Sequence, residues 1–377
     1  MHVTNIHPTY GAQRVRLDAE IHVESGGKRY HVFFDVPHRF VLDLVARAGD
    51  PFLALCLLPA MKLGEDLIVE APVSARLYDS LAHIQSAFSF MHDVQRVEVS
   101  APLHRKGRGL VPFRPKRGLF FSLGVDSFYS LKRLLDNRDT MPLTHLIVVH
   151  GFDIFYKRKN HILFNEVHRR CQQVADHYGL ELLDVVTNQR DFSDRYMNWK
   201  VQYGNGTMAV GLALQRGFER FYFAAGLWMF YDGLLPYGSG HLLTPYWGTE
   251  RVFFQHHGGE LKRREKIEEI SRMPLAMEHL RVCWENPDNA YNCGKCEKCL
   301  RTMIALYVLG KLEDCSSLPN EIDLEDVRTL RINNPTVLPS YRTLICDLEA
   351  MEGKTRFADQ LIEILKDRVS SFRESRS

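Results

Sequence analysis

Short apolar segments alternate with helical segments between Gly118 and Gly226, and this alternation restricts the fold more than any other feature of the chain. Near-continuous apolar strands separated by helices favour a parallel sheet that is covered on both faces. In such sheets, ligands bind beyond the carboxyl ends of the strands. The sequence therefore predicts an α/β fold with functional residues directly after its strands. The expected strands are residues 118–121, 145–150, 180–186 and 220–226, and the expected helices include 162–178 and one that ends at Arg216.

A turn of small and polar residues follows the first expected strand. It consists of Ser122, Leu123, Gly124, Val125, Asp126 and Ser127, and apolar residues at helical spacing come after it. A strand, a tight turn and a helix together point backbone N–H groups at an anion. An ordinary helix N-cap explains the same residues. Because the strands that end at 150–153 and 225–226 are expected at the same sheet edge, we favour a phosphate site.

Residues 1–115 are expected to form a separate α+β domain whose role the sequence does not indicate. Its segments 15–23 and 30–36 flank a Gly-rich turn and predict a β-hairpin, and Ser74 is expected to begin a helix that runs to residue 90. The apolar segment 52–58 is expected to end at Pro59. The basic segment 105–117 is expected to be a linker.

The expected domains are therefore 1–115, a second domain at 116–315, and a helical extension at 316–377 that includes helix 358–369. Between residues 227 and 259 the chain is rich in Gly, Tyr, Trp, Pro and His. A loop of this length is usually functional. Its aromatic side chains would either stack on a heterocyclic substrate or pack the loop against the domain.

The helix that follows carries Lys262, Arg263, Arg264 and Lys266 in its first turns. Basic residues oppose the helix dipole at that end unless an anion lies nearby. The pattern favours phosphate contact by one or two of these residues, and a solvated helix face is the alternative. The neighbouring His256 and His257 indicate a metal only weakly, because neighbours in sequence seldom point at one ion.

Four of the eight cysteines, Cys283, Cys293, Cys296 and Cys299, lie within one short segment. Cys-x-x-Cys turns supply the thiolates that zinc binds in a tetrahedron, and a closed four-thiolate site has a structural role. Cys283 is expected to join the site from a preceding strand. An iron–sulfur cluster is the competing interpretation, but the Cys-Pro ligand of a ferredoxin segment is absent, so we expect zinc.

The 48 basic and 46 acidic residues give a formal net charge of +2, which weighs against a nucleic-acid partner. No apolar run approaches the length of a membrane span, and the first residues lack the apolar region of a signal peptide. We therefore expect a cytoplasmic protein that does not bind membranes.

The turn at 122–127 and the downstream cysteine spacing together resemble the PP-loop ATP pyrophosphatase superfamily, and most of all the 7-cyano-7-deazaguanine synthase (QueC) family. The likeness covers about Gly118 to Leu309 and includes residues 203–207, where the family has a second loop. It implies an adenine-nucleotide α-hydrolase-like (Rossmann-like) fold that binds ATP with Mg²⁺ and releases pyrophosphate. A carboxylate would be adenylated and the adenylate then displaced by ammonia or an amine.

The resemblance assigns roles to individual residues. Catalysis would fall to Asp126, Ser127 and Arg263, with Asp126 positioning Mg²⁺ and Arg263 neutralising the leaving group. ATP would contact residues 122–127 together with His150, Gly151, Asn205 and Thr207. Zn²⁺ would be held by the four clustered cysteines. The partners would be a small, deazapurine-like or other acceptor and an amine donor, and a homodimer is kept open as the assembly.

The chain departs from the family at Leu123, where the usual turn Ser-Gly-Gly-x-Asp-Ser has its first glycine. If that position needs a positive φ, leucine is costly there. The domain 1–115, the helical extension and the aromatic loop also lack counterparts in the usual short synthase. Two alternatives stay open: a tRNA sulfur-transfer enzyme on the same scaffold, and a catalytically degenerate subunit that binds ATP and zinc.

Overall fold

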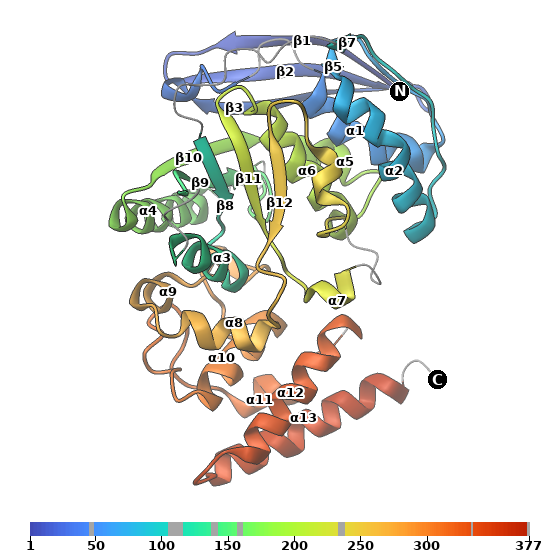
Figure 1. The fold of residues 1–377 in the computed structure, drawn as a ribbon. Coiled ribbons are helices and arrows are strands. Elements are labelled where there is room, and N and C mark those ends of the chain that lie inside the picture. The colour runs from blue at the N-terminus through green and yellow to red at the C-terminus, as the bar shows by residue number, and fades with distance from the viewer. Residues whose placement is uncertain are drawn as a thin grey trace. The chain divides into compact units, whose positions relative to one another are not determined.

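The computed structural model describes residues 1–44, 49–104, 116–136, 142–156, 161–232, 238–332 and 335–374 (Figure 1). Contacts divide the chain into two compact units. Unit 1 is Met1–Phe121 with Leu134–Gly259, and unit 2 is Ser122–Arg133 with Glu260–Ser377. The domain boundaries that we expected stay predictions. The expected linker lies largely outside the described residues.

A ten-stranded sheet, in the order β12-β11-β8-β9-β10-β3-β2-β1-β4-β6, forms the centre of unit 1. Neighbouring strands from β12 to β10 pair in parallel, whereas β3 pairs antiparallel with β10. The predicted α/β fold with a mostly parallel sheet is thus confirmed. The strands are β1 (His2–Tyr10), β2 (Arg14–Val23), β3 (Lys28–Pro37), β4 (Leu67–Val69), β6 (Val99–Ser100), β8 (Lys116–Phe120), β9 (His145–His150), β10 (Glu181–Thr187), β11 (Phe218–Ala224) and β12 (Phe253–His257).

The predicted hairpin is present as β2 and β3, which pair from Arg14 opposite Pro37 to Val23 opposite Lys28. Its second strand, β3, continues into the parallel part of the sheet through β10, where Phe34 lies opposite Thr187. The strands β1, β2, β3, β4 and β6 therefore share one sheet with β8 to β12. Two short strands, β5 (Val73–Ser74) and β7 (Leu103–His104), form a small separate sheet.

Unit 1 also contains helices. They are α1 (Asp50–Leu63), α2 (Ala75–Met91), α4 (His161–Tyr178), α5 (Gln189–Ser193), α6 (Trp199–Ala213) and α7 (Met229–Asp232), with the 3₁₀ turns η1 (His38–Phe40) and η2 (Thr244–Trp247). The hydroxyl of Ser74 accepts a hydrogen bond from the N–H of Leu77 at 3.0 Å, which confirms the predicted start of α2.

Helix α1 corrects our expectation that the apolar segment 52–58 ends at Pro59. The helix continues through Pro59 to Leu63, and its residues from Asp50 to Met61 are buried. Proline removes one backbone hydrogen bond from a helix interior and bends it. Burial of an almost entirely apolar helix outweighs that cost, because each buried large aliphatic side chain contributes roughly 2 kcal/mol.

Helix α6 corrects a second expectation. Residues 203–207, where the resemblance implies a second loop, lie inside α6 and are mostly buried. Glycines along this helix allow close packing. A Cβ atom on Gly204 would lie 1.9 Å from the carbonyl oxygen of Gly238, and one on Gly211 would lie 2.4 Å from the ring of Phe254.

Unit 2 is helical apart from its connecting segments, as predicted for the C-terminal region. It contains most of α3 (Val125–Asp136), followed by α8 (Arg263–Ile270), α9 (Pro274–His279), η3 (Pro287–Asn289), α10 (Glu297–Val308), α11 (Leu324–Arg328), η4 (Pro335–Val337), α12 (Leu338–Ala350) and α13 (Arg356–Glu374). No strand precedes Cys283 in this described region, contrary to our expectation. The short helix α9 and an extended segment do so instead.

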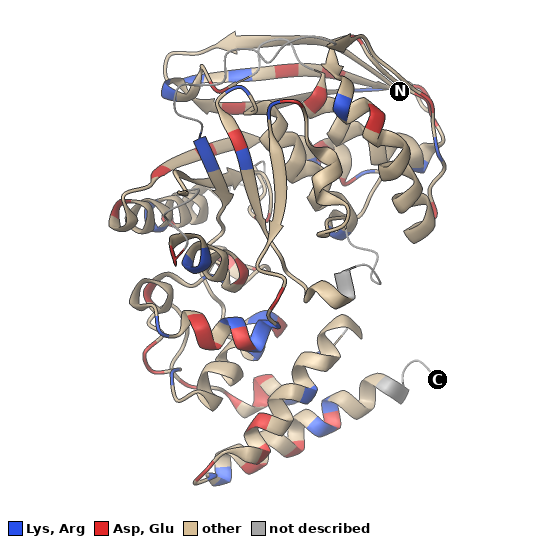
Figure 2. Cartoon of the chain, in the orientation of Figure 1, with Lys and Arg blue, Asp and Glu red and all other residues tan. Residues whose placement is uncertain are grey.

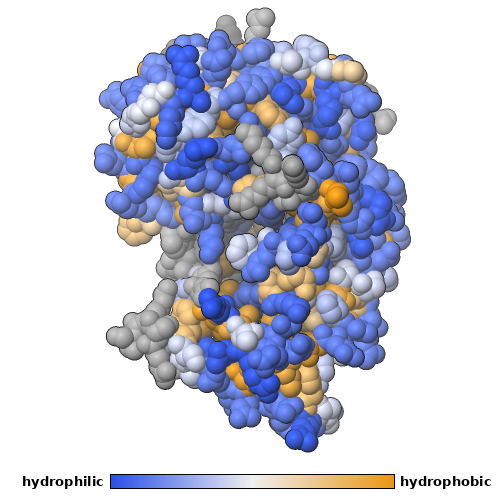
Figure 3. Space-filling model, turned by 180° about the vertical axis from the view of Figure 1, so that it is seen from behind, coloured by the Kyte–Doolittle hydropathy of each residue, from blue (hydrophilic) through white to orange (hydrophobic). Residues whose placement is uncertain are grey.

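Charged residues of both signs are interspersed along α8 and the later helices (Figure 2). The face drawn in Figure 3 is mainly hydrophilic, with apolar residues in small groups. Among the helices that the structure describes, none combines the length and apolar character needed to cross a membrane.

Candidate functional site

The turn at residues 122–127 has an unusual backbone. Leu123 has a φ of +62° although its side chain is fully buried. Its carbonyl oxygen accepts a hydrogen bond from the N–H of Arg281 at 2.8 Å, which helps to hold the turn within unit 2. L-amino acids other than glycine lose about 1–2 kcal/mol in this left-handed conformation. The position therefore requires the backbone that glycine adopts most easily, and leucine occupies it at a cost.

The turn leads directly into α3. Gly124 provides the carbonyl that accepts from the N–H of Phe128 at 2.9 Å, and the hydroxyl of Ser127 donates to the same carbonyl at 3.0 Å. The first N–H groups of a helix have no acceptor within the helix and attract anions. Ser122 is exposed, while Val125 and Ser127 are buried. The predicted strand, turn and helix are confirmed.

Asp126 lies in the first turn of α3 and binds two cations from α8. Its carboxylate oxygens lie 3.0 Å from Nη1 of Arg263 and 3.1 Å from Nζ of Lys266. The side chain of Lys266 is 1 % exposed and that of Asp126 is 22 % exposed. Burial alone would raise the pKa of Asp126, but attraction by Lys266 and Arg263 outweighs burial and lowers that pKa. Asp126 is therefore ionised at neutral pH.

Further charges in unit 2 act on this cluster. On α10, Arg301 is 7 % exposed and donates through Nε to Glu297 at 2.6 Å. The hydroxyl of Tyr341 donates to the same carboxylate at 3.1 Å. Lys298 and Arg301 both attract Asp126. Lys298 and Arg301 therefore add positive charge beside Arg263 and Lys266, and this favours the binding of an added anion.

Two arginines near the turn hold buried donors. Among the described residues, Nε of Arg263 and Nε of Arg281 are buried nitrogen atoms without a hydrogen-bond partner. Arg281 is 6 % exposed, and its Nη2 donates to Asn286 at 2.9 Å. Unsatisfied buried donors cost free energy. An oxygen-rich anion would supply the missing acceptors.

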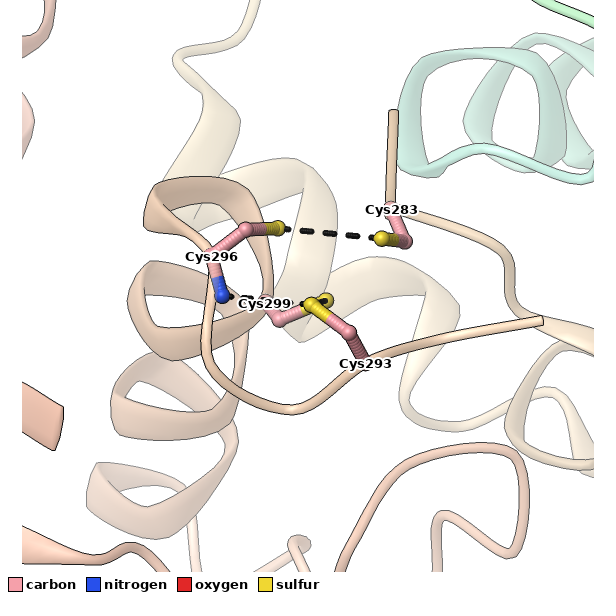
Figure 4. A group of neighbouring side chains, drawn as sticks. All are labelled: Cys283, Cys293, Cys296 and Cys299. Carbon is pink, nitrogen blue, oxygen red and sulfur yellow. Dashed lines mark hydrogen bonds between the residues drawn. The ribbon is translucent and has the colours of Figure 1, made fainter. Parts of the chain in front are cut away.

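The four clustered cysteines come together as predicted. Their sulfur atoms all lie within 4.8 Å of one another. Figure 4 shows the four side chains gathered between the start of α10 and the segment that carries Cys283. Cys283 and Cys296 are separated by 3.8 Å and Cys293 and Cys299 by 3.9 Å. Backbone N–H groups of Asn286 and Cys296 donate to the sulfurs of Cys283 and Cys293, each at 3.3 Å. Such N–H groups stabilise thiolates, and the cluster could hold a metal ion such as zinc.

The cysteine cluster also fixes the start of α10. Cys296 is the N-cap residue of this helix and Cys299 lies in its first turn. Glu297 lies between these two ligands and Arg301 follows one turn after Glu297. A metal bound by the cysteines would therefore hold the segment that carries the Glu297–Arg301 pair.

The other predicted ATP contacts lie in unit 1. His150 ends β9, stacks on Phe164 at 4.1 Å, and has its pKa lowered to about 4 chiefly by burial. Gly151 has a φ of +116°, and a Cβ on it would lie 1.9 Å from the carbonyl oxygen of Thr187. These residues meet the carboxyl end of β10, as expected for neighbouring parallel strands. The turn belongs to unit 2, so one ATP site formed by both groups stays a prediction.

Asn205 and Thr207 lie buried on α6. Thr207 donates its hydroxyl to the carbonyl of Tyr203 at 2.8 Å, within the helix. Both side-chain polar atoms of Asn205 are buried without a partner among the described residues. Asn205 thus fits a ligand contact better than Thr207 does.

The loop between residues 227 and 259 forms α7, η2 and β12, and residues 233–237 lie outside the described part. Trp247 is 1 % exposed and belongs to the core of unit 1, whereas Tyr246 is exposed. At least part of this aromatic loop therefore packs against the protein.

Lys266 is one of the four basic residues from which the sequence predicted phosphate contacts, and it lies three residues after Arg263 on the same helix face. Arg281, Glu297 and Arg301 were not predicted from the sequence. Arg281 has no comparable signal, since its contact with Leu123 joins distant segments. Arg264 was also among the basic residues that the sequence singled out, but it binds Asp347 at 2.8 Å rather than Asp126.

Comparisons with protein-family models, with curated proteins and with solved structures find no match to this chain. The candidate site is therefore interpreted from its own chemistry.

Proposed function

We propose that the protein is an ATP-dependent ligase that adenylates a carboxylate and transfers the activated acyl group to ammonia or an amine. A carboxylate oxygen attacks the α-phosphorus of ATP, and the bond to the β-phosphate breaks, so that pyrophosphate leaves. The amine nitrogen then attacks the acyl carbon, loses a proton, and AMP departs. Carboxylated deazaguanines are the first acceptors to test, because the turn and the cysteine spacing resemble those of the QueC family.

The observation that carries this proposal is the buried cation cluster at the turn. Arg263 and Lys266 lie beside the first turn of α3, and Leu123 keeps the left-handed backbone that shapes the turn. Cations and helix N–H groups fixed in advance stabilise the charge that develops on a departing pyrophosphate. Asp126 supplies the kind of carboxylate oxygen that Mg²⁺ prefers. Bound Mg²⁺ would neutralise phosphate charge.

Zinc is the metal that we propose for the cysteine cluster. A tetrahedral ion with Zn–S bonds of about 2.3 Å separates its sulfurs by about 3.8 Å. The Cys283–Cys296 and Cys293–Cys299 separations, 3.8 and 3.9 Å, agree with that value, and all four sulfurs lie within 4.8 Å of one another. Thiolates that bind different irons of a cluster stand farther apart. The zinc would have a structural role, because all four positions around it are filled by cysteine.

The test is the release of pyrophosphate from ATP in the presence of Mg²⁺ and a panel of carboxylic acids with ammonium. We expect one acid to yield AMP and pyrophosphate in equal amounts, and Arg263→Met to lower that rate by at least tenfold. Arg264→Met serves as the matched control on the same helix and should retain the rate. Failure of every acid to yield AMP, together with failure of the protein to bind ATP, would refute the proposal.

The two alternatives predict different results. A sulfur-transfer enzyme needs reactive, partly exposed thiols, whereas three of the four clustered cysteines are buried. Rapid alkylation of the cluster in the metal-loaded protein would favour it. A degenerate subunit would bind ATP but release no pyrophosphate with any acid.

A further inference from the structure

The cations of the proposed pyrophosphate site are already occupied by a carboxylate of the protein. Asp126 binds Arg263 through one oxygen at 3.0 Å and Lys266 through the other at 3.1 Å. Both contacts have hydrogen-bond geometry as well as opposite charge. Charge-assisted hydrogen bonds of this kind are about twice as strong as neutral ones. An incoming phosphate must therefore compete with Asp126 for these two cations.

Burial makes this competition unequal. The Lys266 side chain is 1 % exposed and the Arg263 side chain is 16 % exposed. Water therefore has little access to either charge and cannot take the place of the Asp126 carboxylate. Removing one partner of a buried ion pair leaves an uncompensated charge and is strongly unfavourable. If a free phosphate took both cations, the Asp126 carboxylate would remain beside it, without partners and with the same sign of charge. Binding of a metal-free phosphate is therefore opposed both by the loss of the Asp126 ion pairs and by repulsion between Asp126 and the phosphate.

A divalent cation changes this balance. When it binds the Asp126 carboxylate, it replaces Arg263 and Lys266 as the counter-charge and leaves both side chains available for phosphate oxygens. Carboxylates and phosphate oxygens are the usual ligands of Mg²⁺, which commonly bridges a protein carboxylate and a polyphosphate. The carboxylate that repels the free anion would therefore attract the metal complex of the same anion.

Resting on the proposed function, we propose that Asp126 is an internal counter-anion that makes this site selective for polyphosphates bound to a divalent cation. The site accepts the magnesium complex of a nucleoside triphosphate or of pyrophosphate. It excludes metal-free phosphates of similar charge. Asp126 thereby determines specificity, in addition to any contact that it makes with the metal.

The test is calorimetric titration of the full chain with inorganic pyrophosphate, once in EDTA and once with excess Mg²⁺. We expect wild-type protein to bind the magnesium complex at least tenfold more tightly than free pyrophosphate. Asp126→Asn keeps the size of the side chain but removes its charge. This variant should bind metal-free pyrophosphate at least tenfold more tightly than wild type and should show little gain from Mg²⁺.

Asp347→Asn is the matched control, because Asp347 carries the same charge as Asp126 but binds Arg264 of the same helix, at 2.8 Å. It should behave as wild type in both titrations. Circular dichroism of each variant checks that it is folded, and the wild-type comparison stands even if Asp126→Asn does not fold.

Equal affinity of wild type for pyrophosphate with and without Mg²⁺ would overturn this inference and leave the ATP site intact. An unchanged metal-free affinity in folded Asp126→Asn would overturn it as well. Absence of binding of pyrophosphate and ATP to every variant, with and without Mg²⁺, would refute the proposed function together with the inference.

Discussion

Leu123 has a left-handed backbone and a fully buried side chain. A smaller residue at this position loses packing, whereas glycine also relieves the backbone strain. The glycine that the resemblance expects at this place would relieve the backbone but remove the packing of the leucine side chain. Sequence could identify the position as a departure from the family turn. It could not show that the chain keeps the left-handed conformation, because that depends on contacts such as the one with Arg281.

Substitution of Leu123 separates these two effects. Leu123→Ala should be destabilising by about 2–5 kcal/mol, since it loses a buried side chain and keeps the strained backbone. Leu123→Gly loses the same packing but relieves roughly 1 kcal/mol of backbone strain. We expect urea unfolding to show the glycine variant to be the more stable of the two. The usual order, with alanine the more stable, would argue against the left-handed backbone.

Asp50 gives a pH dependence to unit 1. It is 3 % exposed, accepts hydrogen bonds from the N–H of Ser74 and from Gln215, and its pKa is raised to about 6 mainly by burial. Because the folded pKa lies above the unfolded value, this group stabilises the fold at low pH. Its contribution is lost as the pH rises through about 6.

We expect the free energy of unfolding of wild type, relative to that of Asp50→Asn, to fall by on the order of 3 kcal/mol between pH 4 and pH 7. Subtracting the variant removes the opposite trend of carboxylates such as Asp184, whose pKa is lowered because His168 and Arg14 outweigh burial. Urea unfolding at each pH measures the difference. A difference that is constant with pH would contradict the assignment.

Helix α6 depends on glycines that sequence alone misplaces. Glycine is a poor helix former, yet close packing requires Gly204 inside the helix. A Cβ on Gly204 would lie 1.9 Å from the carbonyl oxygen of Gly238, a backbone atom, whereas one on Gly206 would lie 3.0 Å from the side-chain nitrogen of Gln189. Contacts between distant segments therefore overrode local propensity.

The two glycines should respond differently to alanine. Gly→Ala in an exposed helix is stabilising by about 1 kcal/mol. Gly204→Ala should instead lower the melting temperature by several degrees, because its Cβ would overlap the Gly238 carbonyl. Gly206→Ala serves as the comparison, since the end of a glutamine side chain can move. Thermal unfolding followed by circular dichroism tests this, and equal melting temperatures would contradict the packing.

The cysteine cluster lies at the start of α10 and could hold a metal ion there. We expect one zinc per chain by elemental analysis, lost in Cys299→Ser together with helical content of unit 2. Cys315→Ser changes a buried cysteine outside the cluster and should keep its metal. Loss of zinc in both variants, or full helical content in metal-free protein, would show that the cluster does not organise this helix.

At the scale of the whole molecule, the spacing of apolar residues predicted the parallel strands and the C-terminal helices, and the spacing of the cysteines predicted their cluster. These features depend on short-range patterns within each segment. The pairing of β3 with β10 and the attraction of Lys266 to Asp126 join residues far apart in sequence. Local patterns do not encode such contacts, so the continuous sheet and the full cation cluster required the structure.

The central claim is that the turn at 122–127 and the cations of α8 bind ATP. Its most direct test is calorimetric titration of the full chain with ATP and Mg²⁺, comparing wild type with Lys266→Met and with the control Arg264→Met. We predict one site per chain, an affinity reduced at least tenfold in Lys266→Met, and an unchanged affinity in Arg264→Met. Binding of ATP that is equally tight in all three proteins, or no binding to wild type, would contradict the claim.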